Sequence, residues 1–101
     1  LYVVPTGRSA IVNSVIVQPT SVTGAAGDAA ISVGTNASDF DDITVTTVLT
    51  GLDATTETIT IDVGGISHTG AAAEDIRFQV DTADSTATTF DVTVYLIGFL
   101  I

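Results

Sequence analysis

Alternation of apolar and polar residues with a period of two is the feature that most restricts the fold of this chain. The pattern is clearest in residues 75–81 and 89–96. Side chains of a β-strand point alternately to its two faces, so each segment is predicted to be a strand with one buried and one solvated face. The buried faces would carry Ile76, Phe78 and Val80 in the first segment, and Phe90, Val92, Val94 and Leu96 in the second.

Weaker patterns predict further strands at residues 1–4, 29–33, 43–50 and 58–63. Residues 9–18 are apolar on both faces, which predicts a strand covered on both sides by the fold or by a neighbouring subunit. There Ile11, Val15 and Val17 share one face, and Ala10, Val12 and Ile16 share the other.

Turn-forming residues separate the predicted strands. They occupy residues 5–7, 21–28, 34–42, 51–56 and 82–87, and Gly64-Gly65 predicts a further corner. About seven to eight short strands in 101 residues predict an all-β fold. We expect an antiparallel, jelly-roll-like β-sandwich that forms a single domain over residues 1–101.

The charge of the chain limits its partners. The chain has twelve acidic residues and only two basic ones, Arg8 and Arg77, so its formal net charge is −10. Nucleic-acid binding depends on Lys and Arg, so we predict no nucleic-acid partner. Attraction to anionic lipids depends on the same residues, and the longest apolar run, residues 94–101, is too short to span a bilayer. We therefore predict no membrane partner.

Candidate catalytic and metal-binding residues are few. The single histidine, His68, follows the predicted Gly64-Gly65 corner without a nucleophile-elbow motif, so we predict that the protein is not an enzyme and has no cofactor. Asp39, Asp41 and Asp42 have oxygen ligands spaced for Ca²⁺, but they lack the glycine and the closing glutamate of an EF-hand. A solvated acidic loop is the favoured interpretation, and Ca²⁺ binding stays as the alternative.

The C-terminal segment is apolar on both faces. Leu96 continues the core face, whereas Tyr95, Ile97, Phe99 and Ile101 share the opposite face. An exposed apolar stripe on a strand favours association, so these four residues are the predicted oligomer interface. Burial beneath loops of the same chain is the other interpretation. Closed symmetry would give a homodimer or homotrimer.

Three stretches resemble small β-sandwich structural proteins of tailed phages. Residues 4–12 are similar to their "VPAGRxAxV" start. Residues 32–37, followed by residues 39–43, resemble their "GTNAxxYxD" loop, although Phe40 replaces the frequent tyrosine. Residues 92–99 are similar to their closing strand. Together these stretches cover both ends and the middle of the chain.

The resemblance implies a capsid decoration (cement) protein on the outer surface of the virion. Such a protein would form homotrimers, bind the major capsid protein and stabilise neighbouring capsomers. Two alternatives remain. One is a glycan- or receptor-binding fibre module, suggested by the Asp/Asn-rich residues 34–42. The other is a surface-layer or adhesin domain of a longer chain, because the sequence begins with Leu1.

Overall fold

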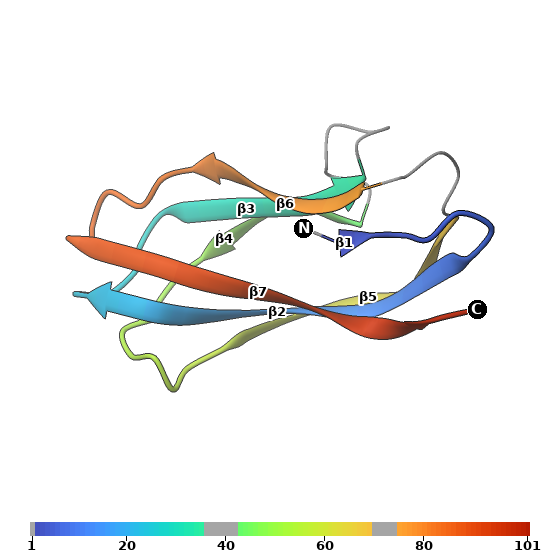
Figure 1. The fold of residues 1–101 in the computed structure, drawn as a ribbon. Helices are drawn as coiled ribbons and strands as arrows, with labels where there is room; N and C mark the ends of the chain where they lie inside the picture. Colours follow the sequence, from blue (N-terminus) through green and yellow to red (C-terminus); the bar gives the residue numbers. More distant parts are fainter. Residues whose placement is uncertain (1, 36–42, 70–74) are drawn as a thin grey trace.

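The chain folds into two antiparallel sheets (Figure 1). This computed structural model describes residues 2–35, 43–69 and 75–101, with only the backbone described at residues 64–69. Over these residues it is all-β, as the alternation predicts. Its strands are β1 (Tyr2–Val3), β2 (Ser9–Thr23), β3 (Ala29–Thr35), β4 (Thr44–Leu49), β5 (Ile59–Thr69), β6 (Asp75–Thr82) and β7 (Thr89–Leu100).

The two sheets face each other as a β-sandwich. One sheet has the order β1-β6-β3-β4 and the other has the order β5-β2-β7, and all pairings are antiparallel. In Figure 1 the four-stranded sheet lies above the three-stranded one. The core lies between their central strands, β3 and β2. Its most deeply buried apolar side chains are Val4, Val15, Val17, Ile31, Val33, Leu49 and Ile76.

A β-bulge in β2 changes which residues face the core. The register of β2 shifts between Val12 and Ser14 against both of its neighbours. An extra residue reverses the alternation beyond it. As a result Val12 lies in the core together with Val15, whereas Ile11 is only half-buried on the opposite face. The prediction that Ile11 shares a face with Val15 and Val17 is therefore wrong.

β2 also extends to Thr23, further than predicted. Residues 21–28 contain turn-forming types, and Pro19 lacks the N–H needed for a sheet ladder. Pairing with β5 ends at Val17, so from Pro19 onward β2 pairs only with β7, through a second register shift between Pro19 and Ser21. A strand with a single neighbour tolerates the missing donor of a proline.

The predicted corner at Gly64-Gly65 lies within β5. β5 continues to Thr69 and pairs with β2 beyond the glycines, where His68 is opposite Ala10. The prediction that His68 follows a corner is therefore wrong. The β2 bulge interrupts the β2–β5 register between Ser14↔Asp62 and Val12↔Ile66, which is where the two glycines lie. Glycine in a strand often marks a bulge.

One side of the sandwich is open. Phe78 and Val80 lie opposite the core residues Val33 and Ile31 in the β3–β6 ladder, so they share the inner face as predicted. They are nevertheless 41% and 59% exposed, so their predicted burial is wrong. β6 and β7 lie along the same side of the molecule, and β1 extends the upper sheet only beside Asp75 and Ile76. No described strand covers the remainder of β6.

Candidate assembly surface

β7 forms an edge of the three-stranded sheet. It pairs with β2 from Ala10↔Leu100 to Thr23↔Thr89, and no strand in the described part of the chain pairs with its other side. Its only charged residue is Asp91, and residues 92–101 are uncharged. Edge strands of soluble proteins usually carry charges, prolines or bulges that block pairing with another chain. β7 therefore has the features of a strand that associates with a partner.

The outer face of β7 carries Tyr95, Ile97 and Phe99, and Ile101 directly follows the strand; all four predicted interface residues are exposed. The exposed fractions are 45% for Tyr95, 44% for Ile97, 55% for Phe99 and 62% for Ile101. We call these four residues the β7 apolar row. Leu96, on the inner face, packs against the core as predicted. The described loops do not bury the apolar row within the subunit.

Neighbouring residues of β2 widen this surface. Ile11 lies opposite Phe99, and Ile16 lies opposite Tyr95. Aromatic and β-branched residues in such cross-strand pairs stabilise a sheet by about 0.2–1 kcal/mol. The apolar surface ends on the far side of β2, where β5 presents exposed Thr60 opposite Ile16. Ile11 is a part of the surface that the sequence pattern missed, because the alternation alone does not locate the bulge.

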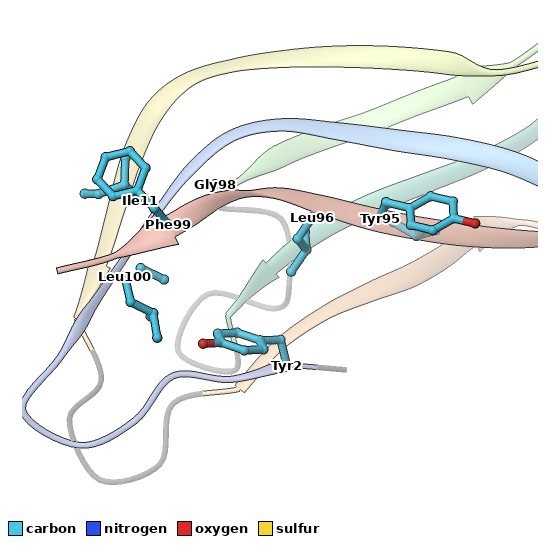
Figure 2. Close-up of a pocket in the computed structure, with 9 residues that line it drawn as sticks. Tyr2, Ile11, Tyr95, Leu96, Gly98, Phe99 and Leu100 are labelled. Atoms are coloured by element: carbon cyan, nitrogen blue, oxygen red, sulfur yellow. The ribbon is translucent and has the colours of Figure 1, made fainter.

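A hollow of about 450 Å³ lies beside the same end of β7 (Figure 2). Its lining includes Tyr2 from β1, Leu96 and Leu100 from the inner face of β7, and Ile11 and Phe99. In Figure 2 Tyr2 lies on the side of β7 occupied by Leu100, whereas Phe99 and Ile11 lie together on the other side. The apolar surface thus continues around the edge of β7.

Gly98 allows β7 to approach β2 closely. A Cβ atom at this position would lie 1.9 Å from the carbonyl oxygen of Ile11 and 3.1 Å from Cα of Val12. The close approach occurs beside the β2 bulge, where Gly98 pairs with Val12. Two backbone hydrogen bonds between Ser9 and Ile101, of 2.9 and 3.1 Å, then hold the end of the chain against β2. Gly98 therefore positions the C-terminal half of the apolar row.

Two acidic side chains connect the loops before β3 and β7. The Asp84 carboxylate accepts hydrogen bonds from the backbone N–H groups of Gly27, Asp28, Ala29, Thr86 and Ala87, at 2.6–3.2 Å. In return, Asp28 accepts hydrogen bonds from the backbone N–H and the hydroxyl of Ser85. These donors, first of all the Ala87 amide, hold the pKa of Asp84 well below its usual value of 3.8. Both carboxylates have a structural role in this arrangement.

We expect Asp84→Asn to lower the thermal unfolding midpoint by several degrees at pH 7. The side-chain NH2 group of asparagine is a hydrogen-bond donor, and it would face backbone N–H groups that are donors as well. The pKa of Asp84 is lowered in the folded state, so its carboxylate contributes stability above pH 3.8. That contribution is lost as the pH falls below 3.8. The difference between the variant and the original protein should therefore narrow as the pH falls from 7 to 2, as measured by circular dichroism melting.

Asp53→Asn, which changes an exposed carboxylate in the β4–β5 loop, is the matched control and should leave the melting curve nearly unchanged. An Asp84→Asn midpoint equal to that of the control at pH 7 would contradict a structural role for Asp84.

Asp81 has a comparable role on the outer face of the four-stranded sheet. Its carboxylate accepts hydrogen bonds from Gln79 at 2.8 Å, Thr46 at 3.1 Å and Ser32 at 3.3 Å. The Gln79 bond has the largest effect, and together these bonds lower the pKa of Asp81. One acidic side chain thus connects β6, β3 and β4 and provides a partner for the buried Ser32.

The other predicted site residues do not form a described site. Asp39, Phe40, Asp41 and Asp42 lie outside the described residues. Within residues 2–35, 43–63 and 75–101, no group of three or more His, Cys, Asp or Glu side chains is arranged to hold a metal ion. The same residues form no helix that is long and apolar enough to cross a membrane.

No protein-family model, characterised protein or solved structure matches this chain. The resemblance to phage structural proteins therefore stays a prediction.

Proposed function

We propose that this protein is a structural assembly subunit, and specifically a capsid decoration (cement) protein on the outer surface of a tailed-phage virion. The observation that carries the proposal is the β7 apolar row, which lies exposed in the uncharged residues 92–101, at one edge of a chain with a net charge of −10. In this proposal the row mediates self-association, and the assembled protein binds the major capsid protein and stabilises neighbouring capsomers.

Burial of the apolar row supplies the driving force for assembly. Removal of apolar surface from water stabilises an interface by about 25 cal/mol per Å². The same surface left exposed is an aggregation hazard for a monomer. The acidic residues other than Asp91 lie outside β7 and keep the particle soluble. The resemblance of residues 4–12, 32–43 and 92–99 to phage structural proteins supports the assignment to a virion.

We expect Phe99→Asp to convert the assembled protein to monomers with little change in the fold. Phe99 is 55% exposed, so the new carboxylate remains hydrated in the monomer but must be desolvated in an interface. Light scattering after size exclusion measures the mass, and far-ultraviolet circular dichroism measures the fold.

Val48→Asp is the matched control, because Val48 is 53% exposed on the other sheet. This variant should keep the original mass. If Val48→Asp dissociates the assembly and Phe99→Asp does not, the interface lies on the four-stranded sheet and the proposed surface is wrong.

The virion assignment has a separate test. The purified protein is mixed with capsids of the tailed phage that encodes it and sedimented, with Phe99→Asp as the comparison. We expect saturable binding of the original protein and protection of the capsids against rupture by heat. An assembled protein that does not sediment with capsids would contradict the decoration role. Binding to a glycan array would then favour the receptor-binding alternative.

A further inference from the structure

We propose that two copies of this chain associate by antiparallel pairing of their β7 edges around a two-fold axis at Tyr95. The two three-stranded sheets then form one continuous six-stranded sheet. This inference rests on the self-association proposed above. It specifies the partner as a second copy, the contact as a backbone ladder, and the stoichiometry as a dimer rather than the trimer that the resemblance implies.

The first support is the length and chemistry of the edge. β7 contains 12 residues and is the longest edge strand: β5, the other edge of the same sheet, has 11, and β4 and β1, the edges of the four-stranded sheet, have six and two. Backbone N–H and C=O groups on a sheet edge are available for pairing with another strand. The edge of β6 is interrupted by charged Arg77 and Asp81, whereas β7 has no charge after Asp91.

The second support is the match between the two copies. A two-fold axis perpendicular to the sheet keeps the outer face of each copy on the same side. With the axis at Tyr95, Ile97 lies opposite Thr93 of the second copy, and Phe99 lies opposite its Asp91. The two Tyr95 side chains then lie side by side at the axis, and each apolar row extends from this point along the outer face of the joined sheet.

The third support is charge complementarity. Arg8 donates a 3.1 Å hydrogen bond from Nε to the carbonyl oxygen of Ile101, which fixes this guanidinium at the C-terminal end of β7. Asp91 lies near the N-terminal end of the same strand. Antiparallel pairing therefore places Arg8 of each copy at the same end of the interface as Asp91 of the other. Parallel pairing in register would instead place the two Asp91 carboxylates side by side, where like charges repel.

The fourth support is the open side of the sandwich. β6 lies above β7 on this side, and its inward-facing Phe78 and Val80 remain 41% and 59% exposed. A second copy that extends the lower sheet past β7 stands directly beside this opening. It therefore shields Phe78 and Val80, as well as the half-buried inner face of β7. The edge pairing and the exposed core-facing residues thus point to the same partner.

The test uses charge reversal in two separately purified variants, Arg8→Glu and Asp91→Lys. Each variant alone should dimerise at least about tenfold more weakly than the original protein, because both contacts become repulsive. An equimolar mixture should form mixed dimers with nearly the original affinity, because Glu at position 8 then meets Lys at position 91 and the original pair forms across the other contact. Native mass spectrometry with one isotope-labelled variant distinguishes mixed from single-variant dimers.

A cysteine pair tests the register. The chain has no cysteine, so Tyr95→Cys introduces a unique thiol at the proposed axis. Directly opposed residues of an antiparallel pair have Cβ atoms about 4.5–5.5 Å apart, close enough for a disulfide after a small adjustment. Mild oxidation should give covalent dimers of Tyr95→Cys and none of the control Val48→Cys.

The outcomes separate this inference from the proposed function. Mixed-dimer rescue together with the Tyr95→Cys cross-link supports edge pairing. A trimer, or a dimer without rescue and without the cross-link, retains an assembly subunit but overturns pairing through β7. A protein that is monomeric at all concentrations tested overturns both.

Discussion

Gly98→Ala should destabilise the subunit by about 3 kcal/mol, near the upper end of the usual cost of overpacking. The added methyl group would lie 1.9 Å from the Ile11 carbonyl oxygen, and that oxygen belongs to the backbone of the central strand β2. Rotation of a side chain cannot relieve such a contact. β7 must therefore separate from β2 at the bulge, and the final strand pairs, Phe99↔Ile11 and Leu100↔Ala10, would be lost.

Chemical denaturation gives the change in the free energy of unfolding for this variant. For a domain of this size, 3 kcal/mol corresponds to a fall of about 15 °C in the unfolding midpoint. Hydrogen exchange shows which part of the fold is destabilised. The backbone amide of Ile101, which donates to the carbonyl oxygen of Ser9, should lose its protection. Dimerisation should weaken as well, because half of the apolar row moves with the strand.

Gly51→Ala is the matched control. A Cβ atom at Gly51 meets nothing within 4 Å, but this residue has a φ of +76°. The left-handed conformation costs an alanine about 1 kcal/mol. A Gly98→Ala variant no less stable than the Gly51→Ala control would show that β7 does not approach β2 as closely as described.

Leu49→Ala should also cost about 3 kcal/mol, whereas Phe78→Ala should cost only about 1 kcal/mol although it removes a larger side chain. Leu49 is fully buried in the core at the end of β4, and its truncation leaves a cavity. Phe78 faces the open side and already contacts water over 41% of its surface. Equilibrium denaturation in the monomeric Phe99→Asp background measures both costs without a contribution from association.

Equal losses in the free energy of unfolding for Leu49→Ala and Phe78→Ala would contradict an open side of the sandwich at β6. The Phe78→Ala cost should rise when the same measurement is made on the assembled protein, because the second copy covers this side chain. A cost that is independent of assembly would leave the subunit fold intact but remove one support for the β7 pairing.

The sequence was sufficient to predict strands where apolar and polar residues alternate. Strand β6 and the first part of β7 appear within one or two residues of their predicted bounds, because alternation at period two requires only local geometry. The all-β class and the antiparallel sandwich follow from the number of such segments. The face of β7 that carries Tyr95, Ile97 and Phe99 was also correctly assigned, since no bulge interrupts this strand.

The sequence could not show where a strand tolerates residues that usually end it. Gly64-Gly65 lies within β5, and Pro19 lies within β2. Both deviations depend on the neighbouring strand: the glycines accompany a bulge across the ladder, and the proline follows the point where β5 stops pairing. Propensity describes a residue by itself, whereas these positions are decided by the hydrogen-bond partners that tertiary structure provides.

The alternation alone therefore determined that this chain is an antiparallel β-sandwich with an apolar face on its last strand. Only the tertiary structure decided which alternating residues are actually buried. Phe78 and Val80 have the same pattern as the buried Ile76, but burial requires an opposing layer, and the second sheet does not extend over the outer part of β6. Likewise, the order of strands in the sheet decided that β7 lies at an edge, because that order depends on contacts between residues far apart in the sequence.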